Sequence, residues 1–168
     1  MQKTLWLGLP AIVLSASIAC SKGTTAPSDL TATTSTRGTF NIAVRPSPIT
    51  ATRCNPQCSG ESGPGSYAFS ADMTIDVQDS AGVGATVTSV TLIATADATT
   101  FSPLVFSSDE IRRQSSTNHV EGRSTLSIPL TIVYNTPTGK ANLGISVSVQ
   151  MTDDRGNQVT ATGQASVL

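Results

Sequence analysis

The most constraining feature of this sequence is its C-terminal end, where apolar and polar residues alternate on both sides of a turn. The alternating apolar positions are Ile145, Val147, Val149, Met151, Val159, Ala161, Ala165 and Val167. A period of two places each apolar set on one face of a β-strand. Because a two-stranded ribbon is only marginally stable alone, the rest of the chain must cover the buried face. The sequence therefore predicts a multi-stranded β-structure that closes with a C-terminal hairpin.

Four earlier segments show the same alternation and predict further strands. They are 39–45, 67–77, 85–96 and 124–134. In the second segment the charges fall on the outward register, since a shift by one residue would bury Asp72 and Asp76 without partners. Pro129 removes one N–H donor from the last segment, which favours an edge strand or a bulge. The expected inward residues are Phe40, Ile42, Val44, Phe69, Ala71, Met73, Ile75, Val77, Val90, Leu92, Ala94, Leu126, Ile128, Leu130, Ile132 and Tyr134.

Between the last two of these segments the pattern is less regular. Residues 104–106 predict a short strand, and residues 108–113 predict a single helical turn with Ser108 as its N-cap. The polar stretch 115–123 predicts a loop that holds the only histidine, His119. We expect this side chain to be solvated rather than catalytic or metal-binding.

Composition agrees with an all-β chain and excludes one class of partner. Charged residues make up only 12% of the chain, and the scarcity of Glu and Lys argues against long helices. The formal net charge is −1 and the sequence contains no basic stripe, so nucleic acid is not expected as a partner. The one adjacent basic pair, Arg112 and Arg113, directly follows Asp109 and Glu110, which neutralise it.

Residues 1–19 have the features of a secretion leader. Lys3 gives a positive start, residues 5–14 form an apolar run too short to span a bilayer comfortably, and small residues precede Cys20. The segment resembles a bacterial lipoprotein signal peptide, in which Cys20 is the lipid attachment site. It departs from that family at Ser17, where Leu is preferred. The alternative is ordinary cleavage after the leader, which leaves Cys20 as a free thiol.

The resemblance implies a membrane partner through the lipid anchor and a place in the bacterial cell envelope. Residues 20–38 are rich in Ser, Thr, Gly, Ala and Pro and predict a flexible tether, which leaves 39–168 as the folded domain. Three acyl chains on Cys20 would anchor the protein firmly. Ser21 instead of Asp implies the outer membrane where the cell has one, and the cell surface otherwise. Without lipidation the domain would be periplasmic or secreted.

The two remaining cysteines predict a disulfide. Cys54 and Cys58 lie in a Gly-, Ser- and Pro-rich stretch, 53–65, that reads as a loop. An even pair in an oxidising compartment favours a local bridge. Zinc usually takes four ligands, and this spacing is not that of a redox motif, so neither a metal nor another cofactor is expected.

The turn of the C-terminal hairpin carries two further observations. Asp153, Asp154 and Asn157 offer oxygen ligands for Ca²⁺, but no spaced acidic ladder or terminal Glu accompanies them. Turn chemistry, with Gly156 at positive φ, is therefore favoured. Residues 152–162 also resemble the last hairpin of bacterial immunoglobulin-like domains. That resemblance implies an immunoglobulin-like β-sandwich of about seven antiparallel strands.

No catalytic constellation is visible, so we do not expect an enzyme. The histidine has no partner motif of the Gly-x-Ser-x-Gly kind, and no phosphate-binding glycine loop occurs. The primary hypothesis is a non-catalytic binding or adhesion module that recognises an envelope protein or a glycan through loops or a sheet face. The alternative is an assembly accessory of a larger envelope complex, which uses an exposed edge strand. The loops 54–65 and 115–123 are the expected places for function.

Overall fold

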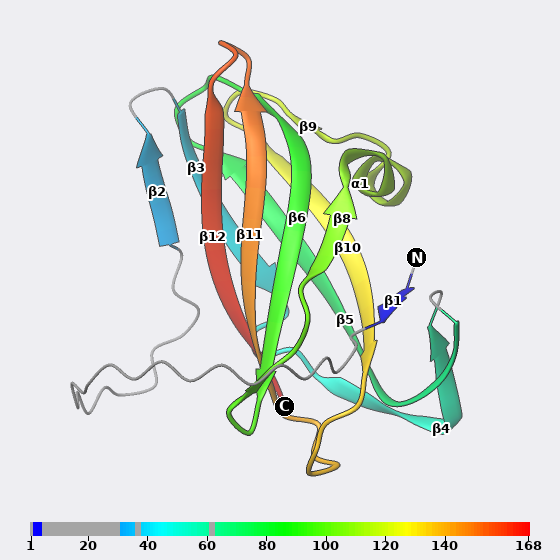
Figure 1. Cartoon of the computed structure of the whole chain (residues 1–168). Helices are drawn as coiled ribbons and strands as arrows, with labels where there is room; N and C mark the ends of the chain where they lie inside the picture. Colours follow the sequence, from blue (N-terminus) through cyan, green and yellow to red (C-terminus); the bar gives the residue numbers. More distant parts are fainter. Residues whose placement is uncertain (1, 5–30, 36–37, 61–62) are drawn as a thin grey trace, which may run out of the picture.

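The computed structural model describes residues 2–4, 31–35, 38–60 and 63–168 and consists of two β-sheets packed face to face (Figure 1). One sheet has the order β1-β10-β5-β3-β2, with β4 also paired to β5. The other has the order β12-β11-β6-β7, with β8 and β9 also paired to β6. The elements are β1 (Gln2–Thr4), β2 (Thr31–Ser35), β3 (Gly38–Arg45), β4 (Ala51–Gly60), β5 (Gly63–Asp79), β6 (Ala85–Ala96), β7 (Thr99–Thr100), β8 (Leu104–Ser107), α1 (Ser108–Ser115), β9 (His119–Val120), β10 (Thr125–Tyr134), β11 (Leu143–Asp153) and β12 (Gln158–Val167).

The long strands pair antiparallel, as hairpin and sandwich connections require. In the first sheet β5 lies between β10 and β3, with Ile75 opposite both Ile128 and Val44. In the second sheet β11 lies between β6 and β12, with Val149 opposite Val90 and Ala161. These registers align apolar residues in rows across each inner face.

One segment joins the two sheets along their shared side. After β3 the chain passes two cis prolines, Pro46 and Pro48, and then Ile49 pairs in parallel with Val167 of β12. The Ile49 N–H donates to the Ser166 carbonyl at 2.8 Å. The segment that begins in one sheet therefore ends on the edge of the other and closes the sandwich there.

The core confirms the alternation expected from sequence. Every inward residue predicted for the strands is buried, with the exception of Ala165, which is partly buried and packs against the core. Tyr134 is fully buried, its ring lies 5.5 Å from the ring of Phe69, and its hydroxyl donates to the Ala141 carbonyl at 2.6 Å. Burial raises the pKa of Tyr134 to about 12.

The predicted all-β sandwich of about seven antiparallel strands is thereby confirmed. Among the described residues, seven strands have eight or more residues, namely β3, β4, β5, β6, β10, β11 and β12. The shorter strands extend the edges of this framework. No helix in the described ranges has both the length and the apolar character needed to cross a bilayer.

The prediction of a loop at 53–65 is wrong for part of this stretch, which forms strand. β4 pairs with β5 through Arg53 opposite Phe69 and Cys58 opposite Tyr67, and the register shifts between these pairs. Composition indicated a loop because the stretch has few apolar residues. The open edge of β5 nevertheless supplies a pairing partner, and the resulting hairpin projects from the sandwich (Figure 1).

Two smaller expectations in the region before β10 also change. The helix covers two turns rather than one, and its N-cap is Ser107, one residue before the expected Ser108. Ser107 and Glu110 form a capping box in which each side chain bonds the backbone of the other.

In the first sheet Asp76 lies on the outward register as expected but is 8% exposed, because it is ion-paired with Arg45 and accepts a hydrogen bond from the Ser127 hydroxyl.

The N-terminal expectations are mostly outside the described residues. Cys20 and the rest of 5–30 lie there, so lipid attachment stays a prediction. Two described pieces do pair with the sheet: β1, from the expected leader, lies parallel to β10, and β2, from the expected tether, lies antiparallel to β3. The Thr-rich composition of β2 suits a pleated surface.

Candidate functional site

The turn between β11 and β12 is held by a buried carboxylate. Asp153 is 2% exposed and accepts hydrogen bonds from the backbone N–H groups of Arg155 and Asn157, at 3.1 and 2.7 Å. The Asn157 amide donates to both Asp153 oxygens, at 2.9 and 2.8 Å. Gly156 has φ of 84°, the left-handed region that glycine tolerates best. Turn chemistry therefore accounts for the roles of Asp153, Gly156 and Asn157.

The same hydrogen bonds occupy both carboxylate oxygens of Asp153, which a cation would need as ligands. Burial by itself would raise the pKa of Asp153, but the hydrogen bonds from Asn157 and Arg155 lower it below its ordinary value. Asp154, another candidate calcium ligand, has its carboxylate beside His119. In the part of the chain that the structure describes, no group of three or more His, Cys, Asp or Glu side chains is arranged to hold a metal ion. Turn chemistry stays the favoured prediction for Asp153, Asp154 and Asn157, and calorimetric titration of the metal-free protein with Ca²⁺ tests the calcium alternative.

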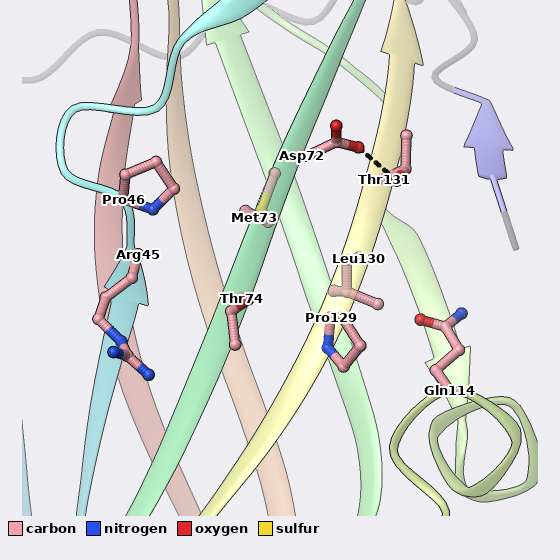
Figure 2. A pocket seen from close by; sticks show the side chains of 9 residues that line it. All are labelled: Arg45, Pro46, Asp72, Met73, Thr74, Gln114, Pro129, Leu130 and Thr131. Atoms are coloured by element: carbon pink, nitrogen blue, oxygen red, sulfur yellow. Dashed lines mark hydrogen bonds between the residues drawn. The ribbon is translucent and has the colours of Figure 1, made fainter.

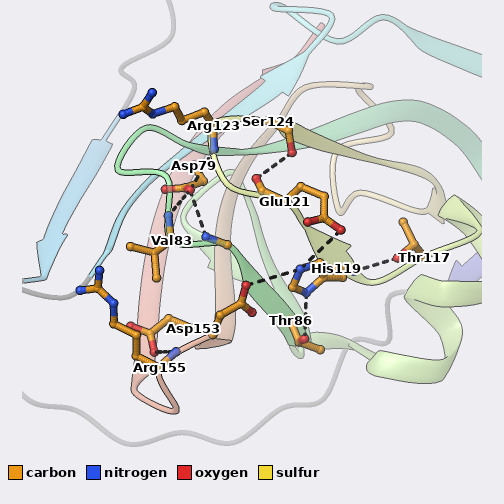
Figure 3. A network of polar contacts seen from close by, with 12 residues as sticks. Asp79, Val83, Thr86, Thr117, His119, Glu121, Arg123, Ser124, Asp153 and Arg155 are labelled. Atoms are coloured by element: carbon orange, nitrogen blue, oxygen red, sulfur yellow. Dashed lines mark hydrogen bonds and ion pairs between the residues drawn. The ribbon is translucent and has the colours of Figure 1, made fainter.

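His119 lies in a polar cluster at this end of the sandwich (Figure 3). Its Nδ1 is 3.2 Å from the Thr86 hydroxyl, and its Nε2 is 3.8 Å from a Glu121 oxygen and 3.7 Å from an Asp154 oxygen. His119 lies on a short strand and not in the expected loop. β9 pairs with the edge of β6, and this pairing leaves the His119 side chain only 29% exposed.

The Thr86 hydroxyl, the His119 imidazole and a carboxylate lie in the order found in the nucleophilic triads of hydrolases. Such a triad needs hydrogen-bond contacts of about 2.6–3.2 Å on both sides of the imidazole. The Thr86 contact meets that limit, but both carboxylate contacts to His119 are longer. The Asp154 backbone is fixed by its own bond to the Gly84 carbonyl, at 3.2 Å. The contacts of the cluster therefore connect β9 with the turn between β11 and β12.

A second buried carboxylate organises the loops beside this cluster. Asp79, at the end of β5, is 1% exposed and accepts four backbone N–H bonds of 2.8–3.1 Å, from Ala81, Val83, Gly84 and Arg123 (Figure 3). Burial alone would raise the pKa of Asp79, but the four donors together lower it below its ordinary value. Asp79 thus fixes both the turn into β6 and the approach to β10.

The predicted disulfide is present. Cys54 and Cys58 are bonded, with their Cα atoms 5.4 Å apart. They lie on β4 in the projecting hairpin, where the Arg53 guanidinium stacks over the Phe69 ring at 5.8 Å. The bridge links two residues of the same strand and lies outside the hydrophobic core.

A groove crosses the outer face of the β3-β5-β10 layer (Figure 2). It has a volume of about 440 Å³ and reaches from Arg45 on β3, over Asp72 and Thr131, to Gln114 on α1. The Thr131 hydroxyl donates to the Asp72 carboxylate at 2.5 Å. The Gln114 Nε2 atom is buried and has no hydrogen-bond partner among the described residues. A buried donor without an acceptor is costly, so this end of the groove is suited to a ligand oxygen.

The opposite layer presents a different surface, which we name the hydroxyl face. It comprises the outward positions of β6, β11 and β12 in four cross-strand rows. The rows are Thr95–Gly144–Ser166, Ile93–Ser146–Gln164, Thr91–Ser148–Thr162 and Ser89–Gln150–Thr160. None of these twelve positions carries a charge. A hollow of about 330 Å³ lies over the two middle rows.

The sequence predicted recognition through loops or a sheet face, but the residues of the hydroxyl face and of the groove were not predicted. The sequence did carry a signal for the face, because the polar residues that alternate with the apolar ones in the two strands of 145–167 are all Ser, Thr or Gln. Their alignment into rows depends on register, which the sequence does not state. The orphan Gln114 amide had no sequence signal, because it depends on where α1 packs.

Comparisons with known proteins support the fold alone. No protein-family model matches the chain, and no curated protein matches it either. The chain is similar to the X-ray structure of Northeast Structural Genomics Consortium target SoR45, with a TM-score of 0.54 and 11% sequence identity. That match covers 76% of this chain and 85% of the other chain. At such identity the likeness concerns architecture and carries no function.

Proposed function

We propose that the chain is a non-catalytic binding domain of the bacterial cell envelope, tethered by a lipid on Cys20, which recognises a neutral glycan through its hydroxyl face. The observation that carries this proposal is the absence of charge from all twelve positions of that face. A charged polymer would gain no electrostatic attraction there.

The chemistry of the face matches sugar hydroxyl groups. Ser and Thr hydroxyls and Gln amides both donate and accept hydrogen bonds, as the hydroxyls of a glycan do. Ile93, 37% exposed within the hollow, offers an apolar contact for the C–H groups of a sugar ring. The three strands are paired along their length, so the polar groups are held on a rigid scaffold.

A glycan array tests this proposal. The probe is the chain without residues 1–19 and with Cys20→Ser, since the hydrophobic core formed by the described residues lies within 40–167. Thr162→Glu puts a carboxylate at the centre of the face, and Thr125→Glu puts one on the outer side of the other sheet. We expect binding to at least one neutral glycan, a loss of tenfold or more for Thr162→Glu, and no change for Thr125→Glu. Absence of binding to every neutral glycan, or equal loss in both variants, would refute the glycan proposal.

Processing of the full chain tests the anchor separately. If Cys20 is lipidated, globomycin blocks maturation and Cys20→Ala prevents it. The lipidated form should partition with membranes and carry acyl chains by mass spectrometry. Unchanged maturation under both treatments would instead support cleavage by the ordinary signal peptidase and a periplasmic or secreted domain.

The alternative function, assembly into a larger envelope complex through an edge strand, is favoured by one observation. β1 lies parallel to β10 and pairs with the outer edge of the first sheet (Figure 1). This pairing indicates that the β10 edge accepts an added strand, as assembly through an edge strand requires. A stoichiometric protein partner in pull-downs from envelope extracts would support assembly.

A further inference from the structure

β10 pairs with β5 on one side and with β1 on the other. We call the second side, the outer edge of β10 from Thr125 to Val133, the seat. Residues Gln2, Lys3 and Thr4 of β1 lie in register opposite Thr131, Ile132 and Val133. From Thr125 to Leu130 the same edge has no paired strand in the described parts of the chain. Pro129, which has no N–H to donate, lies in this stretch, and α1 packs against β10.

The seat continues into the end of the groove. Gln114 of α1 lies beside Pro129, Leu130 and Thr131, which line the groove with it (Figure 2). A strand longer than β1 would run along Pro129 and bring backbone carbonyls close to the buried Gln114 Nε2 atom. One of them would supply the acceptor that this amide lacks.

We infer that in the mature protein the β10 edge captures an extended peptide segment of another protein, added parallel to β10 at the positions that β1 occupies in the whole chain. This inference rests on the assembly alternative proposed above and on removal of residues 1–19, which carries β1 away. Unpaired N–H and C=O groups along an edge strand are a template for such addition.

The register also specifies the chemistry of the captured segment. Residues opposite each other on paired strands share a face of the sheet. The position opposite Ile132 therefore belongs to the inner face, where Ile132 and Leu130 are buried. In β1 this register position is occupied by Lys3. The favoured segment has an apolar residue there and polar residues opposite Thr131 and Pro129, above the groove.

Disulfide capture in trans tests the seat with purified components. The protein is the chain without residues 1–19, with Cys20→Ser and Thr131→Cys. The probe is the peptide acetyl-Thr-Thr-Met-Cys-Lys-Thr-Leu-amide, which places Cys at the position of Gln2, opposite Thr131. Mass spectrometry follows the mixed disulfide in a glutathione buffer. The matched control carries Thr125→Cys, an exposed position on the same side of β10 but six residues earlier.

We expect Thr131→Cys to capture the peptide at least tenfold faster than Thr125→Cys. Replacing Lys by Ile in the peptide should speed capture at least threefold, and Gln114→Ala should slow it at least threefold. Equal rates for the two cysteine positions would overturn the seat, and equal rates for the Lys and Ile peptides would overturn its apolar requirement. Because no envelope extract is involved, failure here is distinct from failure of the pull-down that tests assembly.

Discussion

The carboxylate of Asp79 accepts a hydrogen bond of 3.1 Å from the backbone N–H of Arg123, 44 residues further along the chain. The contact ties the end of β5 to the loop that leads into β10. The backbone N–H of Asp79 donates to the carbonyl of the next residue, Ser124, at 3.0 Å. Side chain and backbone of one residue thus hold the same two segments together.

Replacing Asp79 should therefore destabilise the domain strongly. Asp79→Asn keeps the side-chain shape but offers one acceptor oxygen to four N–H donors. Leaving buried donors unsatisfied costs about 1–3 kcal/mol each in general, so we expect a loss of about 2–4 kcal/mol in the free energy of unfolding. Urea denaturation measures this loss. The control Asp109→Asn, on the exposed start of α1, should cost less than about 0.5 kcal/mol. Equal effects of the two substitutions would contradict the role of Asp79.

Stability should fall in acid because of two carboxylates. The folded-state pKa values of Asp79 and Asp153 lie below the ordinary value of 3.8. Between the lowered and the ordinary pKa the unfolded chain binds more protons than the folded one, so stability rises with pH there. The contribution of these groups is fully present above about pH 5 and is lost as pH falls through the folded values. Urea midpoints from pH 2 to 7 should show this slope, and Asp79→Asn should reduce it. An unchanged slope would show that other groups cause the acid loss.

Gly163 of β12 lies in close contact with Ile42 of β3, where the two sheets meet. A Cβ atom built on Gly163 would lie 2.9 Å from Cγ2 of Ile42 and 3.3 Å from the Ile42 carbonyl oxygen. Gly163→Ala should therefore cost about 1–3 kcal/mol of unfolding free energy through overpacking. Gly144→Ala is the matched control, because a Cβ there meets only the Thr95 carbonyl oxygen, at 3.8 Å. It should be close to neutral.

A double-mutant cycle isolates the contact. Ile42→Ala removes the methyl group that a Gly163 side chain would meet, so the double variant should be more stable than the sum of the single effects predicts. Additive effects within about 0.5 kcal/mol would mean that Gly163→Ala acts through the backbone instead.

The strands could be predicted from sequence because a single rule, period two, fixes both their extent and their buried side. The predicted bounds of 85–96 coincide with β6, and Val90, Leu92 and Ala94 point inward as expected. Elements that depend on a neighbour were missed. β4 has almost no apolar pattern and exists because the edge of β5 is open to it.

The same distinction separates the candidate sites. The Cys54–Cys58 bridge was predictable because these two cysteines remain as a pair once Cys20 is set aside, and because they are close in sequence. The hydroxyl face depends on the register of three strands, and the Gln114 amide depends on the docking of α1 against β10. Neither relation is local, so neither could be derived from residue order.

Reduction of the Cys54–Cys58 disulfide should loosen the projecting hairpin and leave the sandwich folded. A bridge over so few residues removes little entropy from the unfolded chain, and loop-closure arithmetic gives about 2 kcal/mol at most. Neither cysteine belongs to the hydrophobic core. In the Cys54→Ser, Cys58→Ser variant we expect a loss of no more than about 2 kcal/mol and faster amide exchange confined to β4 and the first residues of β5. Intact mass with and without reductant verifies the bond in the native protein. Two titratable thiols before reduction would contradict the bridge, and unfolding of the whole domain on reduction would contradict its peripheral role.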